Sequence, residues 1–141
     1  MGIGSIFQLK KEFASAQPFD QSELRGYYEV RLVTGLLPDI RFFKHFKFFP
    51  NDFEKKGGGF NEFFGFFRIG DFNIKATKSI LGDGENVLNI NYNRAGNPFW
   101  LKPLNDELKK RENYYIGRGV FNLLGIKFNS FYFSLKKSNK Q

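Results

Sequence analysis

Charged residues share a strand phase with phenylalanines in the middle of the chain. One phase holds Glu62, Phe64, Phe66 and Arg68, and alternate residues of a strand face the same side of a sheet. Later in the chain, Arg118 likewise shares a strand phase with Tyr114, Ile116 and Val120. A buried guanidinium needs a carboxylate or phosphate partner, because an unpaired buried charge costs several kcal/mol. Two inward arginines and one inward acid would therefore leave an anion-binding site beside aromatic rings.

A simpler arrangement accounts for the same pattern. The strands could turn their charged residues to solvent, or Glu62 could pair with one of the arginines. A slip of one residue in the register of a strand reverses the facing of every side chain, and the solvent-facing arrangement is the commoner one. The inward arrangement is the more specific hypothesis, and the residues alone leave both open.

Few other residues could carry chemistry. The chain has no cysteine and one histidine, His45, which excludes disulfides, thiolate ligands and histidine-based zinc sites. His45 could act as a general base with help from Asp71, Asp83 or Glu62, but no nucleophile stands in a recognised setting. The glycines at 57–59 do not precede a Lys-Ser/Thr pair, which speaks against a phosphate loop. We predict a protein that is not an enzyme and that needs no cofactor and no metal.

A net charge of +8 suits an acidic partner. Lysines interleave with phenylalanines from Lys44 to Phe48, a combination on which single-stranded bases can stack above a basic groove. Lys136, Lys137 and Lys140 could instead attract an anionic membrane surface, at about 1 kcal/mol each. Nucleic acid and an anionic membrane are therefore alternative partners.

Twenty of the 141 residues are phenylalanine, and twelve of these lie between Phe42 and Phe72. Charged residues and glycines share that stretch, which is typical of an aromatic interior and not of a membrane span. No run approaches the ~18 to 20 uncharged apolar residues of a spanning helix, and the start lacks the order of a signal peptide. We expect one domain over 1–141, with the cytoplasm as its default location.

Alternation of apolar and polar residues predicts strands along most of the chain. The predicted strands cover 24–33, 41–49, 60–69, 72–80, 87–92, 114–121 and 126–135. The spacing of Ile6, Leu9 and Phe13 predicts a brief helix or turn in a lead segment, 1–22.

Glycine and asparagine mark the connections. We predict tight turns at 70–71 and at 82–84, and a cap or long loop at 97–111 that ends in one or two helical turns over 106–111. The basic tail, 136–141, is expected to be frayed.

Short connections between strands imply antiparallel neighbours, because parallel neighbours need a crossover of about a dozen residues. Closure of the sheet removes exposed edges, which favours a barrel over a sandwich. We therefore predict an all-β protein with an antiparallel, barrel-like sheet of about seven to ten strands.

Two short pieces of the chain resemble the calycin superfamily, which includes lipocalins and fatty-acid-binding proteins. Gly26-Tyr27-Tyr28 is similar to the Gly-x-Trp opening of that group, with Tyr28 in place of the tryptophan. Members often lay an arginine from a late strand across the opening aromatic, and Arg118 is similar in type and order. The resemblance implies a cup that carries an apolar small molecule, with Arg118 closing over Tyr28.

These observations lead to a predicted function and two alternatives. We predict non-catalytic binding of an apolar or amphipathic anionic small molecule, similar to a fatty acid, in a barrel cavity. Arg68 and Arg118 would hold the anionic head with Glu62 nearby, and the residues that would line or close the cavity are Tyr28, Phe64, Phe66, Trp100 and Tyr132. The alternatives are a basic surface that binds nucleic acid or an anionic membrane, and a structural protein whose rings fill a solid core.

Overall fold

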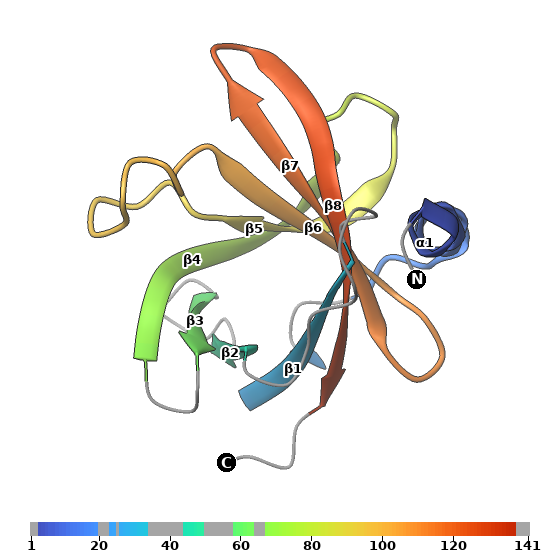
Figure 1. Cartoon of the computed structure of the whole chain (residues 1–141), viewed down its shortest axis with the longest axis horizontal. Helices are drawn as coiled ribbons and strands as arrows, with labels where there is room; N and C mark the ends of the chain where they lie inside the picture. Colours follow the sequence, from blue (N-terminus) through green and yellow to red (C-terminus); the bar gives the residue numbers. More distant parts are fainter. Residues whose placement is uncertain are drawn as a thin grey trace.

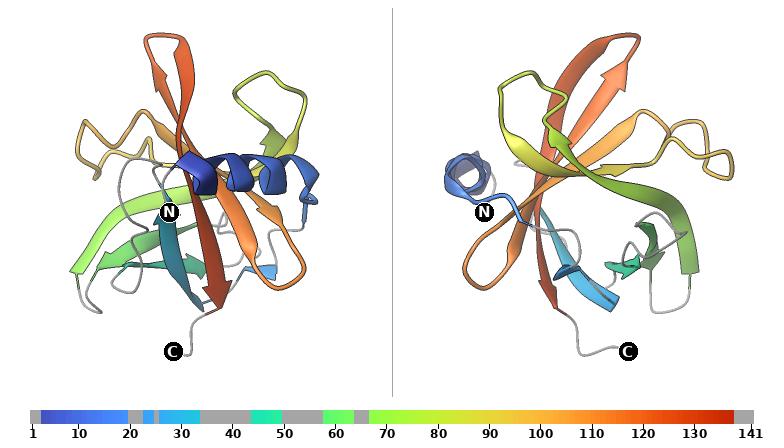
Figure 2. Two further views of the ribbon diagram at one scale, coloured as in Figure 1. Left: turned by 45° about the vertical axis from the view of Figure 1, so that its right-hand side comes forward. Right: turned by 180° about the vertical axis from the view of Figure 1, so that it is seen from behind.

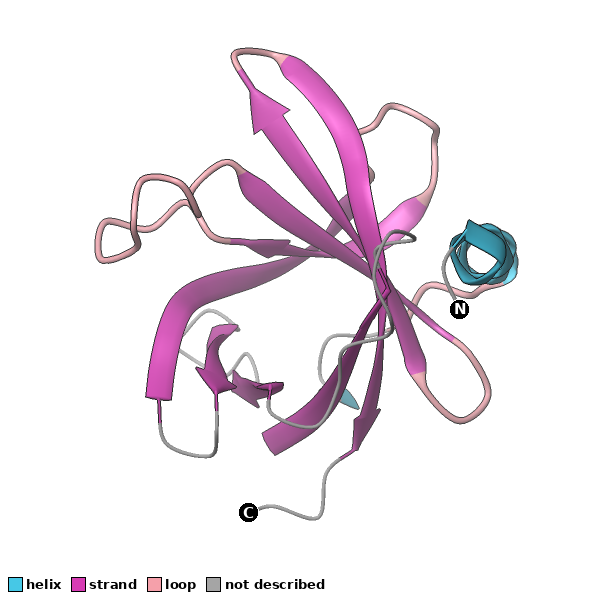
Figure 3. Ribbon diagram, in the orientation of Figure 1, coloured by secondary structure: helices cyan, strands magenta, loops and turns pink. Residues whose placement is uncertain are grey.

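One helix precedes eight strands in the computed structural model, which describes residues 3–19, 23–24, 26–33, 44–49, 58–63 and 67–137 (Figure 3). The elements are α1 (Ile3–Ser15), β1 (Gly26–Val33), β2 (Lys44–Phe49), β3 (Gly58–Phe63), β4 (Phe67–Lys78), β5 (Asn86–Asn91), β6 (Leu104–Lys110), β7 (Tyr115–Leu123) and β8 (Ile126–Lys137). Within these residues, no helix is both long and apolar enough to cross a membrane.

The strands form one antiparallel sheet in the order of the sequence (Figure 1). β1 also pairs with β8, with Val30 opposite Leu135, and this last seam closes the sheet into a barrel. The all-β, antiparallel, barrel-like fold predicted from the sequence is therefore confirmed, with eight strands. The β7–β8 hairpin is long and extends past its neighbours at one end of the barrel.

The inner wall of the barrel is apolar. Inward-facing residues come from β1, β4, β5, β6 and β8 and pack into one buried cluster, which includes Tyr28, Val30, Phe72, Ile74, Leu88, Ile90, Tyr92, Leu104, Leu108, Phe133 and Leu135. On β1, β4, β5 and β8 the buried members are two residues apart, as the pleat of a strand requires. The period-two pattern therefore identified the core face correctly on β1 and β5, whereas Tyr132 on β8, expected in the cavity, lies on the opposite face.

α1 lies across the outside of the barrel, against β7 and β8 (Figure 2). Phe13 and Ala16 are buried beneath it in a second cluster with Val87, Ile116 and Tyr132, while Lys10 and Lys11 remain exposed. The predicted N-terminal helix is confirmed, and it is thirteen residues long. It covers part of the outer face that would otherwise be wet.

The tight turn predicted at 70–71 is wrong. Instead of ending at Ile69, the strand β4 runs from Phe67 through Gly70 and Asp71 to Lys78. Gly59 pairs with Phe72 but Asn61 pairs with Ile69, so β4 carries one extra residue there. Gly70 has φ 73°, and this conformation, which costs glycine little, forms a bulge and not a turn.

Two further boundaries differ from the prediction. The expected helical turns at 106–111 are wrong, because this segment lies within β6 and pairs with β5 and β7. Leu104 and Leu108 are four residues apart, which fits a helix, but Leu104, Asp106 and Leu108 also share a strand phase. The expected frayed tail begins two residues too early, since Lys136 and Lys137 pair with β1; residues 138–141 lie outside the described part.

Candidate functional site

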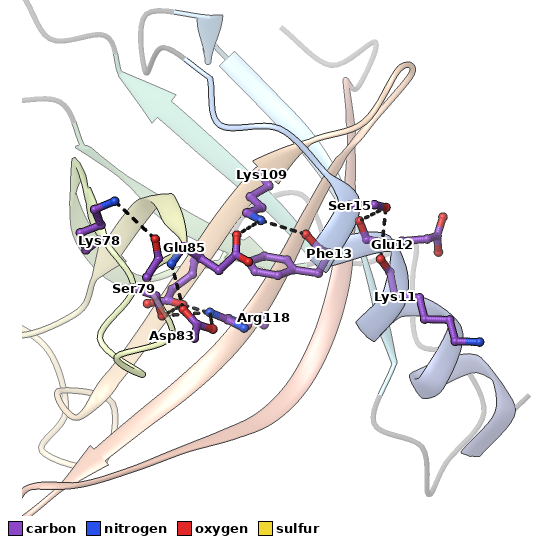
Figure 4. Close-up of polar contacts among 12 residues, drawn as sticks. Lys11, Glu12, Phe13, Ser15, Lys78, Ser79, Asp83, Glu85, Lys109 and Arg118 are labelled. Carbon is purple, nitrogen blue, oxygen red and sulfur yellow. Dashed lines mark hydrogen bonds and ion pairs between the residues drawn. The ribbon is translucent and has the colours of Figure 1, made fainter.

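The predicted ligand-binding residues whose side chains the structure describes lie in different parts of the barrel. Tyr28 lies in the inner cluster, whereas Tyr132 lies in the outer cluster beneath α1. Trp100, expected to line or close the cavity, has 58% of its surface exposed in the β5–β6 connection. Arg118 is buried on β7, on the side that faces α1 (Figure 4).

The remaining predicted residues fall on β3, β4 and the segment between them. Glu62 and Arg68 are register partners across β3 and β4, but their side chains lie outside the described part of the chain. Phe64 and Phe66 lie outside the described residues. The side chain of His45, weighed as a general base, is also outside them.

A late-strand cation crosses the opening aromatic, but it is a lysine. The ammonium of Lys137 on β8 lies 4.9 Å from the centre of the Tyr28 ring, close enough for a cation–π interaction. Tyr115 packs edge-on against the same ring at 5.8 Å. The guanidinium of Arg118, which the calycin resemblance assigned to this role, lies instead 4.4 Å from the ring centre of Phe13 in α1.

Arg118 is the centre of an enclosed ion network on the outer face, seen in Figure 4. Its Nε donates to Oε1 of Glu107 at 2.9 Å, and its Nη2 donates to Oδ2 of Asp83 at 2.9 Å. The same Nη2 donates to Ser79 Oγ at 2.9 Å. Arg118 therefore has two carboxylate partners, and it does not supply the inward anion site that the sequence suggested.

Glu107 is the most deeply buried member of this network. Its side chain is fully buried and accepts hydrogen bonds from Ser79 Oγ at 2.7 Å and from the Ile80 amide at 2.9 Å, in addition to Arg118. Both carboxylate oxygens are thus satisfied by β7 and by the connection from β4 to β5. Three donors around one carboxylate compensate for its removal from water.

Lys109 ties α1 to the same face. Its ammonium is buried, donates to the Phe13 carbonyl at 3.1 Å and forms an ion pair with Glu85. It also lies 5.0 Å from the centre of the Phe13 ring. A cation near the last carbonyls of a helix interacts favourably with the helix dipole, so Lys109 holds the C-terminal end of α1 on the barrel.

The partners of Arg118 and Asp83 favour the charged forms of both residues. For Arg118, burial would lower the pKa, but its hydrogen bonds to Asp83 and Glu107 outweigh burial and the pKa is raised. For Asp83, burial would raise the pKa, but hydrogen bonds from the Glu85 amide and Arg118 outweigh it and the pKa is lowered. Two cations thus meet three carboxylates, those of Asp83, Glu85 and Glu107.

A short chain of hydrogen bonds lies among the apolar residues of the inner wall. Asn61 Nδ2 donates to the Gly70 carbonyl and to the Tyr92 hydroxyl, both at 3.1 Å, and Tyr92 donates to Asp106 Oδ2 at 3.0 Å. Burial first, and the charge of Asp106 second, raise the pKa of Tyr92. Among the described residues, none donates to the buried Oδ1 of Asn61.

Two glycines of β7 face aromatic rings of β8 across the inner wall. Gly117 pairs with Phe133 and Gly119 with Phe131. A methyl group added to Gly117 would come within 2.2 Å of the Phe133 ring, and one added to Gly119 within 2.1 Å of the Phe131 ring. The rings therefore lie directly over the glycine backbone, along the wall of the barrel.

Neither family models nor curated proteins nor solved structures match this chain. The barrel is compatible with a calycin-like fold, and that resemblance gains no further support. Among the described residues, no three His, Cys, Asp or Glu side chains gather in a way that could hold a metal ion.

The sequence prediction missed the acidic partners of Arg118. Glu107 and Lys109 were assigned to helical turns, and Asp83 was considered only as an aid to His45. One signal was present: Asn105, Glu107 and Lys109 alternate with Leu104 and Leu108, which is the pattern of a strand with one apolar and one polar face.

Proposed function

We propose that the interior of this barrel binds an apolar or amphipathic small molecule without transforming it. An eight-stranded barrel has an interior that side chains can fill or that can hold one small ligand. The difference between the two depends on how far the inward side chains reach toward the axis. The described inner wall therefore bears directly on the proposal.

The observation that carries the proposal is the pair of glycine–phenylalanine contacts between β7 and β8. Phenylalanine is the largest apolar residue on this wall, and a ring that stands upright would reach toward the axis. Opposite Gly117 and Gly119, the rings of Phe133 and Phe131 instead lie against the backbone. Flat rings give an apolar lining and leave the space near the axis to a ligand, which would be enclosed by aliphatic side chains from β4, β5 and β6.

The polar end of such a ligand would not bind Arg118, as the sequence prediction had it. Arg118 is bound by two carboxylates on the outer face, so we place no anionic head group on it. The inner hydrogen-bond chain offers Asn61 Oδ1 as an acceptor, which suits a hydroxyl or amide donor. A buried acceptor gains most from a ligand that supplies the missing hydrogen bond.

The resemblance to the calycin superfamily supports the same proposal. That resemblance implies a cup for apolar molecules, and the cation over Tyr28 corresponds in kind to the one expected there, although Lys137 supplies it. The proposal does not depend on membership of that superfamily. It depends on space within the barrel.

Native mass spectrometry of the purified protein tests the proposal directly. We expect a bound small molecule of apolar character, or uptake of N-phenyl-1-naphthylamine, a neutral fluorescent probe, when co-purified material has been extracted. In Gly117→Ala, the added methyl must displace the Phe133 ring from the wall, and we expect several-fold weaker binding of the probe.

The matched control is Gly96→Ala, where an added methyl meets nothing within 4 Å, and probe binding should not change. Thermal unfolding shows whether each variant is folded at the temperature of the assay. A protein that retains nothing and takes up no probe would refute the proposal and favour a solid core. So would equal probe binding by the folded Gly117→Ala variant and the parent.

A further inference from the structure

The β7–β8 hairpin ends in apolar residues that are largely exposed. Leu123, Leu124, Ile126 and Phe128 are exposed, and Leu124 is fully so at 103%. Below them, the rings of Phe121 and Phe128 stack at 5.8 Å across the two strands, which stiffens the hairpin. We call residues 123–126 the hairpin tip.

Leu124 occupies a backbone conformation that does not favour leucine. Leu124 has φ 52° and Gly125 has φ 86°, the positive values of a two-residue turn that prefers Asn-Gly or Asp-Gly. A leucine in this conformation is strained by about 1 kcal/mol or more, and it has no packing in return. A fully exposed leucine in an unfavourable conformation indicates a contact with something outside the chain.

A basic groove lies beside the tip, where the hairpin leaves the barrel. It has a volume of about 490 Å³ and is lined by Lys102 and Lys127 together with Asn91, Asn93, Asn105 and Asn122. No acidic residue is among those that line it. Ammonium groups and amide nitrogens are hydrogen-bond donors, so the groove suits phosphate or carboxylate oxygens.

The groove and the apolar tip form one surface. Asn122 and Lys127 line the groove and directly flank the tip, and the Asn122 amide donates to the Pro103 carbonyl at 3.0 Å. Lys102 also lines the groove, two residues after Trp100, which is largely exposed. We call the tip, the groove and the 99–102 segment the tip surface.

We propose that the tip surface docks on membranes that contain anionic phospholipids. Leucine and isoleucine at the tip would enter the boundary between head groups and acyl chains, where Trp100 is also favoured. Lys102 and Lys127 would then meet the phosphate groups, with their aliphatic stems along the apolar layer. The aliphatic character of the tip favours a bilayer over nucleic acid, since bases stack on aromatic rings.

Co-sedimentation with vesicles tests this proposal. We expect binding to vesicles of phosphatidylcholine and phosphatidylserine, and much weaker binding to phosphatidylcholine alone. The double variant Leu124→Asn, Ile126→Thr removes the apolar surface but keeps residues that suit the turn and the strand. It should bind the anionic vesicles at least about tenfold more weakly.

Charge reversal tests the groove separately. The double variant Lys102→Glu, Lys127→Glu should also lose at least about tenfold in affinity for the anionic vesicles. Its matched control is Lys10→Glu, Lys11→Glu on the exposed side of α1, which changes the net charge equally and should bind more tightly than the groove variant. Equal losses in the two would show attraction by net charge alone and would overturn the proposal.

A fluorescence experiment places the tip itself. Trp100 is the sole tryptophan, so Trp100→Phe, Leu124→Trp moves the reporter to the tip. Its emission should shift to shorter wavelength when anionic vesicles are added. No shift, or tip variants that bind like the parent, would overturn the proposal; a tip variant that only abolishes self-association would assign the surface to a second copy of the chain. These results are independent of the interior, because probe uptake by the barrel does not require the tip.

Discussion

The inner and outer faces of this barrel wall differ in polarity. The inner face is apolar and holds a short chain of hydrogen bonds, from Asn61 through Tyr92 to Asp106. The outer face beneath α1 holds a network around Arg118, in which the two cations pair with three carboxylates. β6 and β7 contribute to both faces, with alternate residues assigned to each.

The difference separates stability from binding. The ion network fixes α1 and the β4–β5 connection to the barrel and offers no vacant site, because its donors and acceptors bind one another. The inner wall is held by apolar packing together with the hydrogen-bond chain from Asn61 to Asp106, and its apolar surface is the part that the proposed ligand would contact. Arg118 is therefore a structural residue. Its neighbours Gly117 and Gly119, whose faces point to the inside of the barrel, shape the candidate site.

Removal of Arg118 should have the largest effect. Arg118→Ala leaves the fully buried Glu107 without its cation, and breaking a buried ion pair costs about 3–5 kcal/mol. Urea denaturation should show this loss in the free energy of unfolding. Arg94→Ala, which alters an exposed arginine, is the control and should change stability by less than about 0.5 kcal/mol. A loss below about 1 kcal/mol for Arg118→Ala would mean that the outer network is not the main anchor of this face.

An intermediate effect is expected on the inner face. Tyr92→Phe keeps the ring, which packs edge-on against Phe72 at 5.6 Å, but removes the donor to Asp106 Oδ2. A buried acceptor that loses its hydrogen bond costs about 1–3 kcal/mol. Tyr115→Phe, which loses an exposed hydrogen bond to Glu23, should be less harmful under the same chemical denaturation. If Tyr92→Phe is neutral, the inner polar chain contributes nothing to the fold.

The smallest effect depends on pH. The pKa of Asp83 is lowered in the folded protein, so its charge stabilises the fold above the unfolded pKa, about 3.9, and this contribution is lost as the pH falls through the folded pKa. Asp83 is 39% exposed, and its pair with Arg118 is therefore worth less than about 1 kcal/mol. Asp83→Asn should be less stable than the parent at pH 7, and the difference should vanish in acid. A difference independent of pH would contradict this assignment.

The sequence predicted the barrel but not the identity of its inner and outer residues. Alternation along β1 and β5 was sufficient, because in these strands one phase is apolar and the other mostly polar. In β7, the two phases hold Ile116, Arg118 and Val120 on one side and Gly117 and Gly119 on the other. The phase with Ile116 and Val120 looks like the core face, yet it faces α1. The inner face is the glycine phase, because rings from β8 cover Gly117 and Gly119.

The candidate site was less predictable for a related physical reason. Arg118 acquires its partners from β6 and from the β4–β5 connection, and which strands adjoin in this way follows from the closed sheet and not from local spacing. The segment 104–110 reads equally well as helix or strand until its neighbours are known. Lys137 could be found only when β8 was known to pair with β1.

The seam between β1 and β8 determines how this barrel is completed. Each other pair of neighbours is joined by one connection along the chain, whereas Tyr28 must meet Lys137, more than a hundred residues later. The entropy lost in closing a loop grows with its length, and such distant pairings form slowly. During synthesis, the ring has to stay open until β8 has left the ribosome, and until then its apolar lining is accessible to chaperones.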